Sequence, residues 1–301
     1  METSWPSLPL GQWQPTRDTV HLWTQIVGKT RLALAPPLNH WWSCALYVTA
    51  RGLTTSLMPY AGGGAEIQFD FTGHELTIAT TNGALRRIKL EPRTVADFYA
   101  EYRSCLEDLA IEVVINTMPN EVPDAIAFDA DTVHADYDAE AVHRFWLSLV
   151  SAHRVMSRFR AGFRGKASPV HFFWGAFDLA ATRFSGRSAP RHPGGIPNCP
   201  DSVMHEAYSE EVSSCGYWPG GAAEGVFYSY AYPVPGGFSD QPVTPDAAYY
   251  DHQLGEFVLP YAAVRASSDP DATLLGFLDS TFQAAYRTAG WPAPGGPHPQ
   301  P

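Results

Sequence analysis

The chain has 301 residues, 45% hydrophobic, 13% aromatic and 17% charged, and this balance excludes a disordered acidic chain, a collagen-like repeat and a coiled coil. Its length permits one large domain or two of ordinary size, and most of the unfolded surface is buried in either case. A formal net charge of −11 argues against a nucleic-acid partner, because phosphate contacts need a cationic surface.

The first predicted element is an amphipathic helix over residues 18–31, which Asp18 caps and a proline pair at residues 36–37 ends. Five runs with strand character follow, at residues 42–49, 52–58, 66–71, 75–80 and 84–90. Turn residues separate these runs, and Asn82-Gly83 between two alternating runs is a strong hairpin signal. The region therefore predicts an antiparallel meander.

The middle of the chain alternates regular and irregular segments. Thr94, followed three residues later by an acid, is a variant capping signature for a helix that runs to about Leu109. Residues 111–115 predict another strand. Residues 117–137 hold too much proline and aspartate for a regular element, so we expect them to wrap the surface or cover a cleft. A helix after Asp138 is predicted to be the longest in the chain.

Aromatic strands dominate the predicted C-terminal half. Residues 170–184 alternate well enough for a strand pair or one long strand, and residues 227–232 form a second aromatic strand. The segment between them, including residues 188–206, is loop-like and has no role that the sequence defines. A final helix over residues 271–289 precedes a tail, residues 291–301, that is too rich in proline to fold.

These elements predict the α+β class: one large domain over residues 1–290, with an antiparallel sheet of several strands and packed helices. A division near residue 165 is the alternative. No stretch approaches the ~20 apolar residues that span a bilayer, and the N-terminus lacks the regions of a signal peptide, so we expect a cytoplasmic protein without a membrane partner. The four cysteines are too sparse for a disulfide framework. The sequence is compatible with a monomer and with a homo-oligomer.

Basic residues are concentrated in one part of the chain. Residues 142–191 hold nine basic residues against the single acid Asp178. Two interpretations are open: the arginines lie against acidic neighbours or solvent, or they form an anion-binding site.

The chain contains the segments GKTRLALAP, NHWW, YVTARGLTTS, PVHFFWGAFDLAATRFSGR and EEVSSCGYWPG. Together they resemble a bacterial family known only as a domain of unknown function, number 5996, and the resemblance runs from about Trp13 to Trp291. This resemblance implies no reaction. The family pattern has a histidine where this chain has Glu210, so no metal role is carried over to that position.

No P-loop, G-x-G-x-x-G, G-x-S-x-G or H-E-x-x-H motif is present, so no nucleotide cofactor is expected and the cofactor stays unknown. Polar residues in apolar surroundings are the remaining candidates. Lys29 and Arg31, at the end of the first helix, either belong to a solvated stripe or hold a carboxylate or phosphate. His40, next to two tryptophans, is either a hydrogen-bonded core residue or a ligand.

The strand run at 170–184 carries the most informative pattern. A period of two puts His171, Phe173 and Phe177 on one face and Trp174, Asp178 and Thr182 on the other. A buried Asp178 needs a partner, and Arg183 or Arg187 is the predicted one. The pair is either structural or the setting of a catalytic carboxylate.

Two further groups complete the candidates. His171, Glu206 and Glu211 form a His/Glu set that could bind a divalent metal, Fe, Mn or Zn. Tyr228, Tyr230 and Tyr232 point to one face of their strand, which is either ordinary aromatic packing or the wall of a pocket. We predict one pocket around His171, Glu211 and these tyrosines, with His40 and Arg183 at its edge, provided that the strands are neighbours.

The first hypothesis for function is an enzyme that acts on a small anionic or aromatic metabolite by acid–base chemistry, with or without a metal. Its predicted catalytic residues are His171, Glu211, Asp178 and His40, and its predicted substrate-binding residues are Lys29, Arg31, Arg183, Arg187, Trp174, Tyr228, Tyr230 and Tyr232. The second hypothesis is a non-catalytic protein that binds a small molecule or a partner. Polar residues inside apolar strands favour the enzyme.

Overall fold

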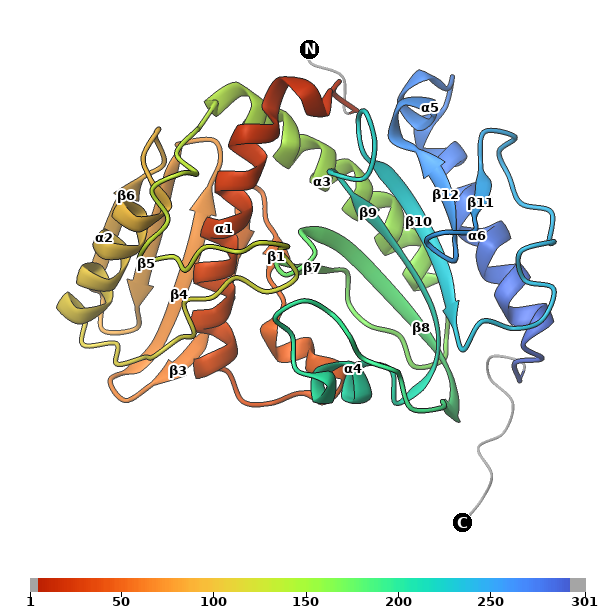
Figure 1. Cartoon of the computed structure of the whole chain (residues 1–301), viewed down its shortest axis with the longest axis horizontal. Coiled ribbons are helices and arrows are strands. Elements are labelled where there is room, and N and C mark those ends of the chain that lie inside the picture. Colours follow the sequence, from red (N-terminus) through yellow and green to blue (C-terminus); the bar gives the residue numbers. More distant parts are fainter. Residues whose placement is uncertain (1–4, 293–301) are drawn as a thin grey trace.

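A computed structural model describes residues 5–292 (Figure 1). Its two sheets are antiparallel and are packed with helices, which confirms the predicted α+β class. The first sheet has the order β1-β2-β4-β5-β6, with β3 paired to β4, and the second has the order β11-β12-β10-β9-β8-β7.

The first sheet contains β1 (Tyr47–Val48), β2 (Gly52–Thr54), β3 (Met58–Tyr60), β4 (Gly63–Asp70), β5 (Glu75–Thr80) and β6 (Leu85–Lys89). The second contains β7 (His171–Phe173), β8 (Asp178–Ser188), β9 (Glu210–Trp218), β10 (Val226–Tyr232), β11 (Tyr249–Asp251) and β12 (Glu256–Pro260). The predicted meander and the hairpin at Asn82-Gly83 are confirmed, since β5 and β6 pair and Gly83 has a φ of +88°.

The helices are α1 (Leu10–Leu34), η1 (Asn39–Cys44), α2 (Val95–Asp108), α3 (Ala139–Ala161), α4 (Asp201–Ala207), α5 (Tyr261–Ala266) and α6 (Pro270–Thr288). The side chains of Thr94 and Asp138 cap α2 and α3 as predicted. The longest helix is α1, with 25 residues against 23 in α3, which corrects the prediction. α1 begins eight residues before Asp18, which is therefore inside the helix and does not cap it. The helix includes Pro15 in its second turn, where the missing N–H costs one helical bond.

Of the predicted strands, one is absent from the described residues and one is shortened to β1. Residues 111–115 form no ladder, and Val114 projects into solvent. The run at 42–49 begins instead in the 3-10 helix η1, because His40 and Trp41 adopt the left-handed backbone region, with φ of 56° and 60°. This turn places Trp42 over His171, with 5.9 Å between the ring centroids.

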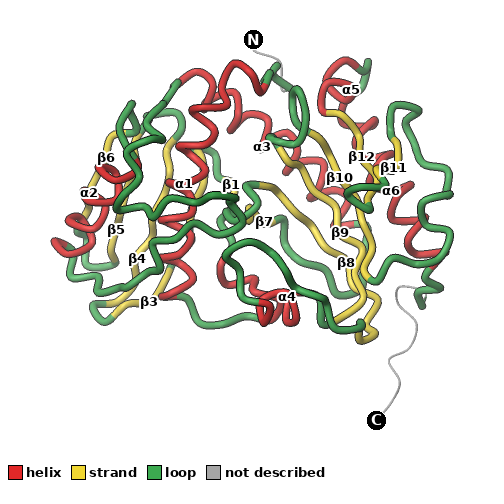
Figure 2. The backbone as a smooth tube through the Cα atoms, in the orientation of Figure 1, coloured by secondary structure: helices red, strands yellow, loops and turns green. Residues whose placement is uncertain are grey.

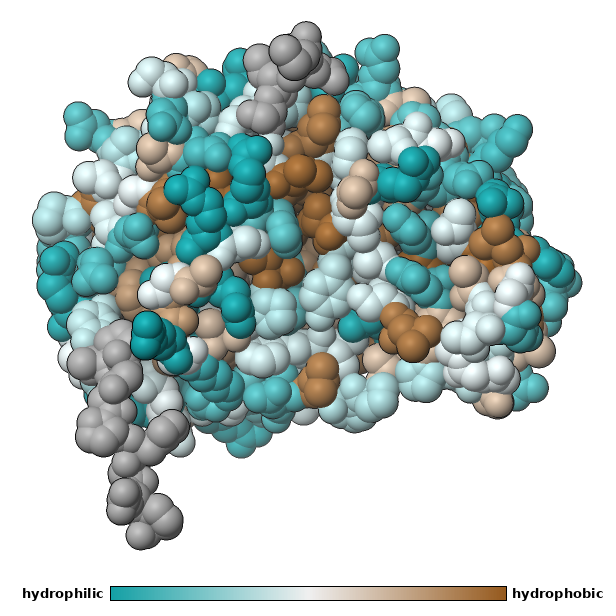
Figure 3. Space-filling model, turned by 180° about the vertical axis from the view of Figure 1, so that it is seen from behind, coloured by the Kyte–Doolittle hydropathy of each residue, from teal (hydrophilic) through white to brown (hydrophobic). Residues whose placement is uncertain are grey.

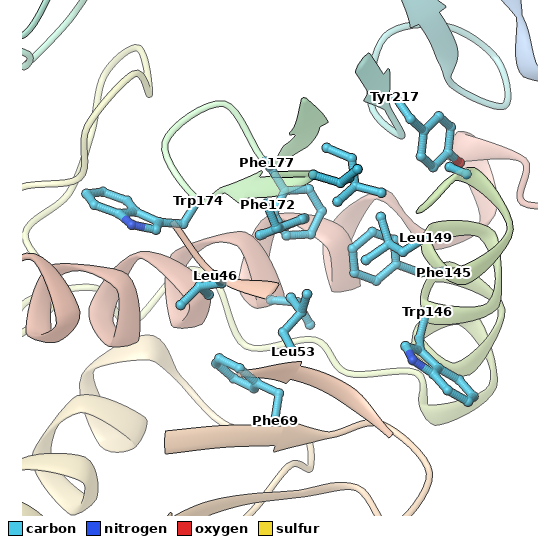
Figure 4. Packing of buried hydrophobic residues seen from close by; sticks show 14 of the residues in the cluster. Leu46, Leu53, Phe69, Phe145, Trp146, Leu149, Phe172, Trp174, Phe177 and Tyr217 are labelled. Carbon is cyan, nitrogen blue, oxygen red and sulfur yellow. The ribbon is translucent and has the colours of Figure 1, made fainter. Parts of the chain in front are cut away.

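The two sheets share one core. Leu46 and Phe172 exchange backbone hydrogen bonds of 2.8 and 2.9 Å and join the edges of the sheets. Figure 4 shows Phe69 of the first sheet, Phe172 of the second and Phe145 of α3 in one apolar cluster. α3 therefore packs across both sheets, as the sequence predicts.

The two faces of the second sheet differ in what covers them. α3 and α6 pack on one face, where Leu179, Tyr217 and Phe227 are buried. The molecule seen from behind has a mainly hydrophilic surface with small apolar patches (Figure 3). Irregular segments lie over the other face, α1 runs beside its β7 edge (Figure 2), and a cleft lies beneath the irregular segments.

The folded region extends past the predicted boundary at residue 290. Trp291, which the sequence analysis assigns to the tail, is buried against Phe282, with 5.9 Å between the ring centroids. The rest of the predicted tail, residues 293–301, lies outside the described residues. In residues 5–292 no helix is long and apolar enough to cross a membrane.

Candidate functional site

A cleft of about 1240 Å³ lies between the second sheet and its irregular cover. The floor consists of residues of β8, β9 and β10, and the walls come from α1, η1 and the cover. Aromatic rings dominate the lining, which includes Trp42, Phe173, Trp174, Phe177, Tyr208, Trp218, Tyr228 and Tyr230. The volume exceeds that of an ordinary small-molecule site, so a ligand of metabolite size fits inside.

A row of paired residues across the sheet forms the floor. Tyr228 of β10 pairs with Gly216 of β9, and Gly216 pairs with Ala180 of β8. Ala180 in turn pairs with His171 of β7. Directly paired residues point to one face, and the two small residues in the middle leave a trough. The ring of Tyr228 lies across this trough, since an added Cβ at Gly216 would come within 2.3 Å of its hydroxyl.

Asp178 is the central polar group of the cleft. It is 6% exposed, and the Tyr228 hydroxyl donates a short hydrogen bond to its carboxyl. Burial raises the pKa of Asp178 to about 7, although the bond from Tyr228 opposes the shift. Asp178 therefore exchanges a proton near neutral pH, whereas the pKa of Tyr228 is raised well above its ordinary value, so its hydroxyl stays protonated.

Two more carboxyls line the cleft near Asp178. Burial raises the pKa of Glu256 to about 7 and also raises that of Glu121. The negative charges of both glutamates raise the pKa of Asp178 further. The carboxyl of Glu121 packs on the backbone of Gly175, where an added Cβ would come within 2.1 Å.

Hydroxyl pairs continue the polar floor. Tyr208 and Tyr230 share a hydrogen bond of 2.7 Å, and Thr182 and Ser214 share one of 2.9 Å. All four line the cleft. These groups give a bound molecule several donors and acceptors on an otherwise apolar surface.

The cover of the cleft consists of residues 117–137 and 186–207, and it is tied to α1. Lys29 donates a 2.6 Å bond to the carbonyl of Met118, and the Gln25 amide exchanges two 2.8 Å bonds with the backbone of Asn120. The Glu121 N–H donates to the carbonyl of Pro197, which joins the two segments. Residues 117–137 thus cover a cleft, which was one of the two expectations, and the segment 188–206 shares that role.

His40 lines one end of the cleft. Its Nδ1 lies 3.2 Å from the carbonyls of Glu206 and Ala207 and therefore carries the proton. Its Nε2 accepts from Lys166, 2.7 Å away, and Lys166 also pairs with Glu210. Both nitrogens of the imidazole are thereby occupied by protein groups. His40 shapes this end of the cleft and has no free nitrogen for acid–base chemistry.

The predicted role of His171 is not supported. It lies on the same face of the sheet as Tyr228, but β8 and β9 separate the two strands. Trp42 and Tyr47 cover the ring, which is 1% exposed and outside the lining of the cleft. Burial lowers the pKa of His171 to about 4, so it stays neutral. The predicted faces are also corrected, because the turn at 174–177 brings Phe173 opposite Asp178.

The predicted basic residues lie away from the cleft. Lys29 holds the cover, and Arg31 is buried over the ring of Tyr47, 5.4 Å from its centroid. Arg183 extends from the opposite face of the sheet, where its guanidinium lies over Phe159 and donates to the carbonyl of that residue. The predicted ion pair of Arg183 with Asp178 is therefore wrong.

Arg187 and Glu211 also belong to the opposite face. They form a 2.7 Å ion pair, and Arg187 donates to the carbonyl of Ala289 at the end of α6. The prediction that either one contacts a substrate or Asp178 is wrong. The pair instead fixes α6 to the sheet.

The predicted metal ligands do not meet. Glu206 accepts from the backbone N–H of His40, Glu211 pairs with Arg187, and His171 is enclosed by aromatic rings. Within residues 5–292 no three His, Cys, Asp or Glu side chains form a group that could hold a metal ion.

The predicted aromatic residues are divided between the cleft and its cover. Trp174, Tyr228 and Tyr230 line the cleft, whereas the hydroxyl of Tyr232 donates to the carbonyl of Pro190 beneath the cover. The sequence analysis missed Glu121, Glu256 and Tyr208. No pattern marked Glu121 or Glu256, since each is a lone acid whose position beside Asp178 arises from tertiary structure.

Gly216→Ala tests whether the trough positions Tyr228. The added Cβ would meet the carbonyl oxygen of Leu179 at 2.2 Å and the Tyr228 hydroxyl at 2.3 Å. We expect a loss of about 1–3 kcal/mol in the free energy of unfolding, as in other overpacked sites. Denaturant titration measures the loss, with Gly11→Ala, where an added Cβ would meet nothing within 4 Å, as the control. A change below about 0.5 kcal/mol would contradict this geometry.

The model of one family matches residues 5–295, nearly the whole chain. The chain belongs to a family of unknown function, DUF5996. Neither the curated proteins nor the solved structures include a significant match. For this DUF5996 member, functional inference therefore depends on the cleft itself.

Proposed function

We propose that this DUF5996 protein is an enzyme that binds a small, largely apolar or aromatic metabolite in the cleft and transfers a proton through Asp178. The observation that carries the proposal is the carboxyl of Asp178, whose pKa of about 7 suits a general acid–base group at neutral pH. A carboxylate that only forms a surface ion pair does not need a raised pKa.

The surroundings of Asp178 support proton transfer. Tyr228 donates to one carboxyl oxygen and fixes the orientation of the group. The apolar walls lower the local dielectric, which strengthens hydrogen bonds to a substrate. Arg31, Arg183 and Arg187 were predicted to bind an anionic substrate, but none of them lines the cleft. The aromatic class of substrate is therefore favoured over the anionic class.

The alternative is a binding protein without catalysis. The aromatic lining supports it equally well, but a binding site does not need a carboxyl that titrates at the working pH. The two functions differ in one observable: only the enzyme exchanges protons between a ligand and the solvent.

The test is deuterium incorporation. The protein is incubated in D2O with a metabolite extract, and mass spectrometry identifies compounds that gain deuterium or change in mass. We expect such compounds with the wild type and a loss of at least about 100-fold in rate with Asp178→Asn. Glu75→Gln, a carboxyl-to-amide change on the surface of the first sheet, is the control. Equal rates for wild type and Asp178→Asn, or no exchange with either, would leave the binding function.

A further inference from the structure

The cleft contains carboxyls without partners of opposite charge. The carboxyls of Glu121 and Glu256 have no hydrogen-bond or ion-pair partner in the described part of the chain, and Asp178 has only Tyr228. Asp178 is 6% exposed, and its ionised form has no positive charge beside it in residues 5–292, which raises the free energy of the empty protein. A positive charge inside the cleft would remove this cost.

Residues 5–292 of the protein supply no free positive charge there. Arg17 lines the mouth, but its guanidinium binds the neighbouring Asp18. Burial lowers the pKa of His21 to about 4, so this histidine is neutral. Both ring nitrogens of His40 are paired with protein groups, and Nδ1 of His134 pairs with Asp131 at 2.7 Å. Every basic side chain that lines the cleft is thus neutral or paired.

Aromatic faces surround the same space. Tyr228 and Tyr230 stack with 6.0 Å between centroids, and Tyr208 lies 6.3 Å from Tyr230. Trp174 and Phe177 line the cleft as well. Ring faces attract cations through their quadrupole, and a desolvated cation gains most. Carboxyls and aromatic faces together are the chemistry that recognises an ammonium group.

From the cleft geometry, the unpaired carboxyls and the ring faces, we propose that the substrate is a cationic amine with an apolar or aromatic group, whose ammonium lies among Asp178, Glu121 and Glu256. This inference rests on the proposed function and names its substrate class. The ammonium fills the place of the missing counter-charge, and the apolar group packs on the rings. The net charge of −11 also draws cations toward the protein.

A bound ammonium changes the protonation of the carboxyls. Asp178 and Glu256 have a pKa of about 7 in the empty cleft, so both are partly protonated at neutral pH. A nearby cation favours their ionised forms, so binding releases protons into solvent. Amine affinity therefore rises from pH 6 to pH 8, a range in which an alkylamine keeps its own charge. In the complex Asp178 is a carboxylate and acts as a base.

The experiment compares matched ligands by calorimetry. The probes are 2-phenylethylamine, its neutral isostere 2-phenylethanol, and further amine and alcohol pairs of increasing size. We expect the amine of the best pair to bind at least about tenfold more tightly than its isostere at pH 8. The difference shrinks at pH 6, and titrations in two buffers of different ionisation enthalpy detect proton release.

Variants identify the groups that hold the ammonium. Glu256→Gln and Glu121→Gln each lower amine affinity by about tenfold and leave the affinity for the alcohol unchanged, while Glu75→Gln changes neither. Melting curves establish that each variant is folded. Alcohols that bind as tightly as their amines would overturn the amine inference and leave the proposed enzyme standing. Deuterium exchange without binding of any amine would also overturn the amine inference and leave the proposed enzyme standing. Absence of both amine binding and deuterium exchange would overturn the amine inference and the proposed enzyme together.

Discussion

Asp178→Asn should stabilise the protein at pH 8 by roughly 4 kcal/mol relative to the wild type, although it removes the proposed catalytic group. The pKa of Asp178 rises from 3.8 to about 7 on folding, and each unit is equivalent to about 1.4 kcal/mol. The folded state holds the proton of Asp178 more tightly than the unfolded state does. The contribution of this proton to the free energy of unfolding is therefore fully present below pH 3.8 and is lost as the pH rises through about 7. Asparagine cannot ionise and escapes this loss.

Urea unfolding at several pH values measures the effect. The advantage of Asp178→Asn should grow by roughly 3 kcal/mol between pH 5 and pH 8 and stay constant above that range. Glu75→Gln, at a surface ion pair, should show a small difference throughout. A difference between wild type and Asp178→Asn that does not vary with pH would show that the carboxyl titrates normally.

Arg183→Ala should destabilise the protein by about 3 kcal/mol and leave deuterium exchange per folded molecule unchanged. The guanidinium lies 3.4 Å from the centroid of Phe159 and 4.2 Å from that of Phe282, and it is 5% exposed. Its removal leaves a cavity between α3 and α6 and takes one of two hydrogen bonds from the carbonyl of Phe159, which keeps the bond from the N–H of Gly162.

Arg183→Met separates packing from charge. Methionine fills most of the same volume, so this variant should recover more than half of the lost stability. Chemical denaturation gives both values. If Arg183→Ala folded as stably as the wild type and lost deuterium exchange, the sequence-based assignment of Arg183 to substrate binding would be right and the structural role wrong.

Local signals in the sequence predicted local structure well. Thr94 and Asp138 mark the starts of α2 and α3, because side-chain caps act over three residues. Asn82-Gly83 marks a hairpin because its backbone geometry suits few other residues. The strand predicted at 42–49 is confirmed only at Tyr47–Val48, since residues 42–44 belong to a 3-10 turn that brings Trp42 onto His171.

The sequence predicted residues of the strand that forms the floor of the cleft, but it did not predict which residues of other segments lie beside them. Strand periodicity placed Trp174 and Asp178 on the face that forms the cleft. The same periodicity puts Asp178 and Arg183, five residues apart in β8, on opposite faces, so it already excluded their pairing. Glu121 and Glu256 reach Asp178 from segments far away in sequence, and one sequence holds no record of such contacts.

Ala180, in the floor of the cleft, acts as a size filter. A larger side chain at this position would occupy space that a ligand would otherwise fill, whereas the space over Gly216 is already taken by the ring of Tyr228. Within the family, a member with a larger residue at position 180 would accept a smaller molecule while keeping Asp178 and Tyr228 in place. Ligand size and proton transfer are thus set by different residues of the same sheet, and one can change without the other.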